Sequence, residues 1–304
     1  MTDVLDGVIG GVLGAFLSTK EQKLHDQIIL LIDSHNASVA TNEISFEHTF
    51  ARALKKSPDL HDNYVRTLVS SDLYESDPIF ASKKLYLKTI SALGRGIPCN
   101  SPLLRAAFMG CIRSHSESIR YAETICKVTH PDSRCVACCV AIAMMVYQFI
   151  NVGQPMGILQ IIESSIASAK PLLEKKYYPE FLRCLGSSLS GLRSYDNNHA
   201  FKTAGAVVWS LRELWRAAKA ADIANIAGST TGSITMRNKK LFEKTIAAVH
   251  EEAGPVAACL AGACLGSALG RINLPIDGLS AQKIEDIDKC LGEWLKRNFE
   301  ANSK

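Results

Sequence analysis

Aromatic side chains are scarce in this sequence: only 7% of its 304 residues are Phe, Trp or Tyr, whereas 47% are hydrophobic in total. A core of this composition is filled mostly by aliphatic and small side chains. The length is large for one domain but not excessive for a helical one. We therefore expect one large core of small and aliphatic residues.

A large excess of charge of either sign is also missing. Lysine and arginine number 34 and aspartate and glutamate 30, which gives a formal charge of +4, and the two signs are interspersed along the chain. Proteins that bind nucleic acids typically carry a basic stripe or patch. The sequence therefore predicts no nucleic-acid partner.

Long hydrophobic runs are absent from both ends of the chain. The apolar stretches Val4–Leu17 and Pro255–Leu269 are shorter than the roughly 20 residues of a membrane-spanning helix. The first lies among acidic residues and lacks a cleavage site, unlike a secretory signal. The ten cysteines favour periodic helical positions, as free thiols do in a reducing compartment. These features predict an intracellular, cytoplasmic protein without a membrane partner.

Several catalytic and binding motifs are absent. The sequence has no P-loop, no dinucleotide fingerprint and no Ser/His/Asp constellation. Cys135, Cys138 and Cys139 form a Cys-x-x-Cys-Cys run that suggests zinc, but a structural zinc site needs a second ligand pair and none is evident. On a helix these cysteines share a face with Ile142 and Met145, so we interpret them as core residues.

The sequence does contain the 3.6-residue hydrophobic period of helices along most of its length, and no strand pattern. Thr129–Asp132 predicts a helix start, with Thr129 as the cap and an acid three residues later. The range 218–238 contains a Gly/Ser/Thr-rich run that predicts a mobile insertion. No linker divides the chain, so we expect one all-α domain over residues 1–304. The predicted helices are 4–17, 23–35, 45–56, one or more within 58–94, one from 101, then 117–128, 131–150, 156–168, 179–192, 200–217, 239–252, 255–269 and 280–299.

Small residues recur at four-residue intervals near the C-terminus, at Gly254, Ala258, Gly262, Gly266 and Gly270. This spacing places them in a row on one face of a helix. A face without side chains lets another helix approach the backbone closely. We expect helices 4–17 and 255–269 to be buried side by side, since both carry small residues at this spacing.

Four segments in this order resemble the ADP-ribosylglycohydrolase family: a glycine-rich helix, a Thr-His-Pro-Asp segment, an apolar helix with Trp, and the small-residue helix. They lie at Gly7–Gly14, Thr129–Asp132, Ala206–Trp209 and Ala261–Gly266. The resemblance extends over most of the chain in order and spacing. It implies a single compact, orthogonally packed all-α domain.

The resemblance also implies a centre of two divalent cations, usually magnesium, held by a Thr-Asp-Asp-Thr cluster and a C-terminal Asp-rich run. The matching positions are Leu24–Gln27, where only Asp26 is a suitable ligand, and Ala253–Val256, which has no carboxylate or hydroxyl. Hard cations require several anionic oxygens. Glu251 and Glu252 lie on the preceding turn and point about 100° apart. We therefore expect no cofactor and no dinuclear metal site, with Asp26 the only plausible retained ligand and magnesium needed only if the protein is active.

A second part of the family's site is a Gly-Asn-Gly loop before Met-Arg, which helps to hold the diphosphate of ADP-ribose. Asn100 and Arg105 match this pattern, while both glycines and the Met do not. Ser101 precedes Pro102 at a favoured helix start, whose N–H groups attract anions. Asn100, Ser101 and Arg105 are therefore the candidate ligand-binding residues, and an ordinary helix start is the alternative.

Three functions stay open. A pseudoenzyme would keep the fold to bind ADP-ribose, a related nucleotide or a protein partner without the magnesium site. An active but atypical ADP-ribosyl hydrolase would use Asp26, Glu251 and Glu252 as catalytic residues around one cation. A structural protein would use the compact fold alone, as in the crystallin branch of the family, which His25–Gln27 resembles. The missing carboxylates favour the first and the third.

Overall fold

The fold is helical in every part of the chain that the computed structural model describes, namely residues 2–18, 98–111, 114–127, 130–151, 157–226 and 234–278, with 280–282, 284–285 and 289. Within these ranges there is no strand, and extended backbone pairs only at a bridge between Cys99 and His199. The predicted all-α class is confirmed. The predicted helices 23–35, 45–56, 58–94 and most of 280–299 lie outside the described residues.

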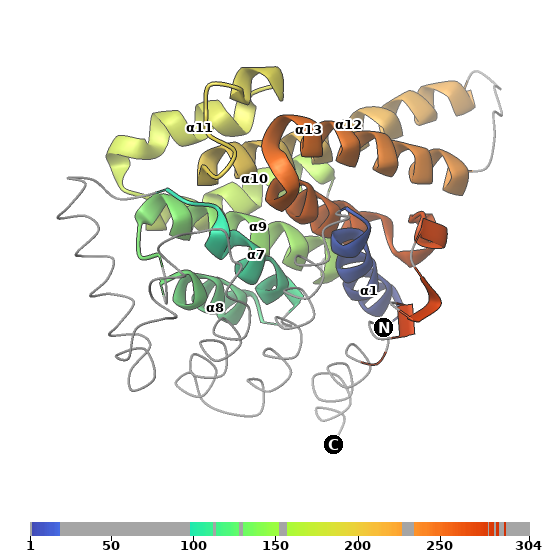
Figure 1. Ribbon diagram of the computed structural model, residues 1–304, viewed down its shortest axis with the longest axis horizontal. Helices are drawn as coiled ribbons and strands as arrows, with labels where there is room; N and C mark the ends of the chain where they lie inside the picture. Colours follow the sequence, from blue (N-terminus) through green and yellow to red (C-terminus); the bar gives the residue numbers. More distant parts are fainter. Residues whose placement is uncertain are drawn as a thin grey trace.

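Most α-helices begin and end within about two residues of the predicted positions, but α11 ends at Gly186 and not at 192, α12 ends at Ile226 and not at 217, and α13 begins at Ile234 and not at 239. They are α1 (Thr2–Leu17), α7 (Ser101–Ala107), α8 (His115–Lys127), α9 (Ser133–Asn151), α10 (Ile158–Ala169), α11 (Tyr178–Gly186), α12 (Ala200–Ile226) and α13 (Ile234–Leu269). Short 3-10 turns are η1 (Phe108–Cys111), η2 (Lys170–Leu172), η3 (Lys175–Tyr177), η4 (Ser190–Leu192), η5 (Arg271–Asn273) and η6 (Ile276–Gly278). Figure 1 shows α7 and α9 in the middle, with α11 and α12 above them and α8 below.

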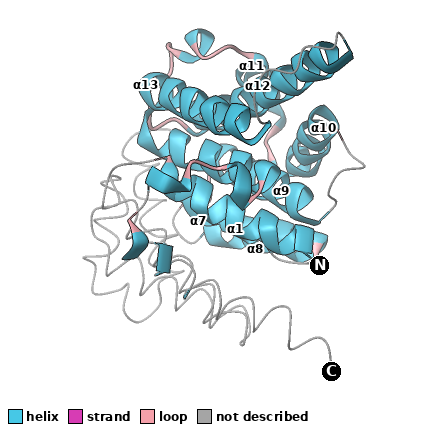
Figure 2. Ribbon diagram, turned by 90° about the vertical axis from the view of Figure 1, so that its right-hand side faces the viewer, coloured by secondary structure: helices cyan, strands magenta, loops and turns pink. Residues whose placement is uncertain are grey.

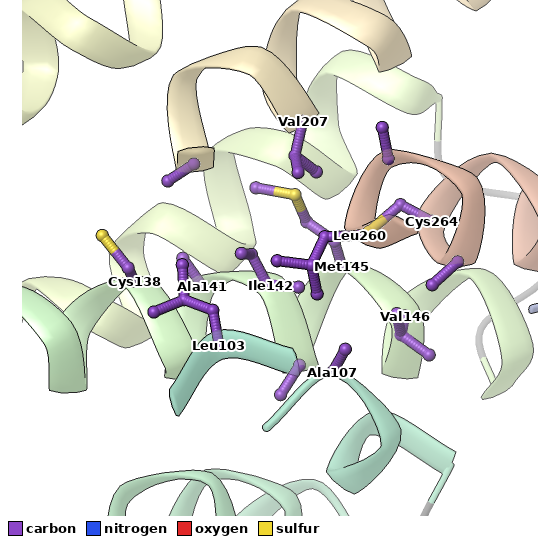
Figure 3. Packing of buried hydrophobic residues seen from close by; sticks show 14 of the residues in the cluster. Leu103, Ala107, Cys138, Ala141, Ile142, Met145, Val146, Val207, Leu260 and Cys264 are labelled. Carbon is purple, nitrogen blue, oxygen red and sulfur yellow. The ribbon is translucent and has the colours of Figure 1, made fainter. Parts of the chain in front are cut away.

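Helix α9 forms the centre of the core. It is buried along most of its length and contacts α1, α7, α8, α10, α12 and α13. Figure 3 shows Leu103 of α7, Ile142 of α9, Val207 of α12 and Leu260 of α13 in one apolar cluster. Helices α9 and α13 are both long and apolar enough to cross a membrane, but 78% and 72% of their apolar windows are buried inside the protein.

The start of α9 differs from the prediction. The helix begins at Ser133, and the Oδ1 atom of Asp132 accepts the backbone N–H of Arg134 at 2.9 Å. This makes Asp132 the N-cap. The Arg134 guanidinium also donates to the same carboxylate, at 3.0 Å from Nε and 2.7 Å from Nη2. The predicted cap at Thr129 was wrong, because the acid expected inside the first turn is itself the cap; Thr129 lies outside the described residues.

The backbones of α1 and α13 are in direct contact. A Cβ atom added to Gly10 would lie 2.2 Å from the carbonyl oxygen of Gly266, and one added to Gly14 would lie 2.1 Å from that of Gly262. Any side chain at these positions would push the helices apart. The predicted side-by-side burial is confirmed, and Figure 1 shows α1 against the C-terminal part of α13.

Helix α13 consists of two helical halves that meet at Gly254. This residue has φ 87° and ψ 176°, in a region that is essentially restricted to glycine. Pro255 follows as the first residue of the second half, a favoured position for proline. The chain turns back so far that Asn238 Nδ2 donates to Asn273 Oδ1 at 3.1 Å. The break at Gly254 separates two helical halves, as the sequence predicted with helices 239–252 and 255–269. Figure 2 shows the helices from the side.

Helices extend into the predicted insertion at 218–238 from both sides. Helix α12 continues to Ile226 and α13 begins at Ile234. The residues 227–233 between them lie outside the described part of the chain. An insertion over the whole range was too wide a prediction, because the Ala-rich end of α12 has high helix propensity although its hydrophobic period is weak.

Candidate functional site

The starts of several helices meet around one short segment, residues 98–100. The backbone N–H of Asn100 donates to Asn198 O at 2.7 Å, and that of Ala200 donates to Pro98 O at 2.7 Å. These bonds tie the start of α7 to the start of α12. From the first turn of α9, the Cys135 thiol donates to the carbonyl of Cys99 at 3.2 Å.

The second half of α13 starts beside the same segment. A Cβ atom added to Gly254 would lie 3.5 Å from Cβ of Asn197, in ordinary contact. The starts of α7, α9, α12 and the second half of α13 are therefore neighbours, and we call them the helix-start junction (residues 98–101, 132–135, 195–203 and 253–256). Helix N-termini carry partial positive charge, so this junction favours negative charge nearby.

Asn100 is buried at the centre of the junction, with 3% of its surface exposed. Its Nδ2 atom donates to the carbonyl of Asn197 and to Oγ1 of Thr203, both at 3.0 Å. Both amide protons are thus used within the protein. The residue that the family resemblance assigned to ligand binding therefore fastens α7 to α12 through its amide nitrogen, and its contact with a ligand stays a prediction.

The other two predicted ligand-binding residues lie on α7. The helix begins at Ser101, as predicted, and Leu103 N–H donates to Asn100 O at 3.0 Å. Arg105 follows one turn later on the same helix. The side chains of Ser101 and Arg105 are outside the described part of the structure, so their contact with a ligand stays a prediction.

Lys202 places a buried positive charge in the junction. Only 3% of its surface is exposed, and its Nζ donates to Asn197 Oδ1 at 2.7 Å and to the carbonyl of Tyr195 at 3.1 Å. Burial lowers the pKa of the Lys202 ammonium, while Glu252 and Asp196 act in the opposite direction. The Asn197 side chain connects this cation with the break in α13: its Oδ1 accepts from Lys202 Nζ, and its Cβ lies beside Gly254.

The two glutamates predicted as substitutes for the lost ligands are not placed as a metal-binding pair. Glu252 Oε2 accepts from Arg193 Nε at 2.7 Å, and a second bond joins Glu252 Oε1 to Arg193 Nη2. This bidentate pair lowers the pKa of the Glu252 carboxyl. Glu251 points into solvent.

The donor groups of the junction do not suit magnesium. Ala253–Val256 has no side-chain oxygen, Glu252 is bonded to Arg193, and Asp132, the buried carboxylate of the junction, is bonded to Arg134. Among the described residues no group of three or more His, Cys, Asp or Glu side chains is arranged to hold a metal ion. Asp26 lies outside the described residues, so the absence of a metal site stays a prediction.

The cysteines of α9 belong to the core. Cys135, Cys138 and Cys139 are fully buried, and burial raises the pKa of the Cys135 and Cys138 thiols well above the usual value. A protonated, inaccessible thiol is a poor nucleophile and metal ligand. Within the described ranges all cysteines are free and buried, as the sequence predicted for thiols used as small hydrophobic residues.

Sequence reasoning missed Asn197, His199 and Lys202. Two signals could have found them. An Asn-Asn-His run directly precedes an apolar helix, where capping residues are expected. Lys202 is the only charged residue in the first eleven positions of that helix, and such a charge needs buried partners.

The whole chain was also compared with known protein families. Residues 7–303 match the sequence profile of the ADP-ribosylglycohydrolase family. No curated protein matches the sequence significantly.

Proposed function

The chain belongs to the ADP-ribosylglycohydrolase family, and from this premise we propose that it is a pseudoenzyme. In this proposal the protein lacks the two-magnesium centre and keeps the fold to bind ADP-ribose or a related nucleotide. The observation that carries the proposal is the helix-start junction at Gly254. Where the family resemblance places acidic metal ligands, this segment presents backbone, the Asn197 amide and, behind it, the Lys202 ammonium.

Electrostatics supports this choice. A divalent cation near a buried ammonium is repelled, and the repulsion is strong where water is excluded. The same ammonium attracts an anion, and the partial positive charges of the surrounding helix starts act in the same direction. An anionic nucleotide therefore suits the junction better than a metal ion does.

Two other functions are weaker. An atypical hydrolase would use Asp26, Glu251 and Glu252, but Glu252 is bonded to Arg193 and Glu251 faces solvent. A crystallin-like structural protein needs no buried cation beside a break in a helix. A protein partner in place of a nucleotide is a further alternative within the pseudoenzyme function.

The direct test is isothermal titration with ADP-ribose, once with magnesium and once with EDTA. We expect weak binding of equal strength in both, because no metal takes part. A ligand at ten times its Kd adds about 1.4 kcal/mol of stability, so a thermal-shift panel that includes NAD gives an independent measurement. No heat at millimolar ADP-ribose, in a folded protein, would favour the structural function.

A matched pair of variants tests whether the Lys202 ammonium contributes to ADP-ribose binding. Lys202→Met should weaken ADP-ribose binding about tenfold, the effect expected for one lost charged interaction, while Lys240→Met on an exposed position of α13 should not. The free energy of unfolding of each variant must be measured beside its affinity.

Turnover of ADP-ribosylated arginine or serine, or of O-acetyl-ADP-ribose, should be absent or very low. Turnover that Asp26→Ala abolishes would replace the pseudoenzyme with the atypical hydrolase. If Asp26→Ala kept the rate, the choice of metal ligand would be wrong as well.

A further inference from the structure

His199 caps the first turn of α12 through its ring. It is the residue before Ala200, where the helix begins, and its Nδ1 accepts the backbone N–H of Phe201 at 3.1 Å. Its carbonyl accepts the N–H of Thr203 at 3.1 Å, the first bond of the helix itself. Side-chain acceptors at this position typically bond the second or third N–H of a helix. Here the acceptor is an imidazole nitrogen, which accepts only while it is unprotonated.

The ring is held in this orientation by neighbours on both sides. Its centroid lies 4.9 Å from that of Tyr195 and 5.6 Å from that of Phe201. The backbone of His199 also forms the bridge to Cys99, next to Asn100. The cap is thus mechanically linked to the 98–100 segment of the helix-start junction.

We propose that His199 is a pH-sensitive cap whose protonation opens the first turn of α12 and loosens the helix-start junction. Protonated Nδ1 carries a hydrogen and would face the Phe201 N–H, so the bond is lost and two donors oppose each other. The new positive charge also lies at the positive end of the α12 dipole. If the proposed function holds, the affinity for an anionic nucleotide changes as the junction loosens.

Several charged groups surround the imidazole. Burial lowers the pKa of His199 and Arg134 lowers it further, whereas three carboxylates raise it. These carboxylates come from three elements: Glu180 of α11, Asp132 at the start of α9, and Asp196 of the loop before α12.

The sign of the pH effect follows from the net lowering. Because the folded pKa lies below the ordinary 6.5, the unfolded chain binds more protons between the two values. The stability contributed by the cap is complete above pH 6.5 and is lost as the pH falls through the folded pKa. The junction should therefore be closed at neutral pH and open once the pH falls below the folded pKa of His199.

Amide hydrogen exchange of the full-length protein at pH 7.5 and 5.5, corrected for the intrinsic rates, tests the proposal. In the wild type the Phe201 amide should exchange about fivefold faster at pH 5.5, the factor expected for loss of one cap. His199→Asn, whose side chain caps at both pH values, should remove this difference. His199→Ala should be unprotected at both, and His250→Asn, at an exposed position of α13, should behave as the wild type.

Equal protection at both pH values in the wild type, or the same acid-induced loss in His199→Asn, would overturn the proposal. Titration with ADP-ribose at both pH values separates it from the proposed function. No binding at any pH would contradict the proposed function alone, and the exchange result would still decide the role of His199. Acid-induced opening with an unchanged ADP-ribose affinity would overturn the link between the cap and the binding site.

Discussion

The contact between α1 and α13 and the helix-start junction lie at opposite ends of the same helical half, residues 255–269, yet they follow different rules. At the first, the two backbones are in contact, since a Cβ atom on Gly14 would lie 2.1 Å from the Gly262 carbonyl. At the second, buried polar side chains are hydrogen-bonded within the protein: Asn100 donates to Thr203, and Lys202 donates to Asn197. The packing surface agrees with the family resemblance. In the proposed function, the chemistry of the polar surface has changed while the steric fit beside it is kept.

The largest effect should come from the packing surface. Gly14→Ala forces α1 away from α13, and overpacking of this kind costs about 3 kcal/mol of unfolding free energy. Urea denaturation followed by circular dichroism measures it. Gly186→Ala is the control, because a Cβ atom there meets nothing within 4 Å. Equal stability of the two variants would show that the close contact does not stabilise the protein.

An intermediate effect is expected at the junction end of the same helical half. Gly254→Ala has ordinary room next to Asn197 but places an L-residue at φ 87°, which costs about 2 kcal/mol. Gly191→Ala, with comparable room and no positive φ, is the control. The same urea denaturation applies. If both variants lose an equally small amount of unfolding free energy, the backbone conformation of Gly254 does not stabilise the break.

The smallest effect belongs to the ion pair at the edge of the junction. Glu252→Gln removes the partner of Arg193, and exposed pairs contribute little because solvent screens them. The paired carboxyl has a pKa below 4.5, so its contribution is present above pH 4.5 and is lost as the pH falls through the folded pKa.

Thermal unfolding between pH 3 and 7 should therefore show a slightly flatter acid limb for Glu252→Gln than for the wild type. Glu251→Gln is the matched control, since it removes an adjacent charge without removing the bonded pair. If only Glu251→Gln had a flatter acid limb, Glu251 and not Glu252 would be the source of the acid dependence, which would contradict the prediction.

The contrast between the two surfaces also explains what the sequence could predict. Glycines four residues apart specify a helix contact by local spacing alone, so the pairing of α1 with α13 was predictable. Lys202 bonds Asn197 and Tyr195 of the adjoining loop, but their place beside Gly254 arises only when α12 and α13 are brought together, and no local pattern contains that information. The end of α12 was missed for another reason: Ala-rich helices have high propensity but little hydrophobic period.

The predicted site had a mixed outcome for the same reason. The start of α7 at Ser101 was evident from Ser-Pro, which acts locally. The use of both Asn100 amide protons depends on Asn197 and Thr203, which lie 97 and 103 residues later. The cap of α9 was misplaced by three residues because two polar residues, Thr129 and Asp132, competed for one position and only the bond to Arg134 decides between them.

The contact of α1 with α13 has a consequence for biosynthesis. Helix α1 leaves the ribosome early, but the glycine surface that covers it is translated only after α12 is complete. Its interaction therefore has high contact order, which slows the step that closes it. Until then the apolar face of α1 is exposed, and nascent chains in this state are prone to aggregation. Helix α1 therefore stays without the partner that it contacts so closely until most of the chain has been synthesised.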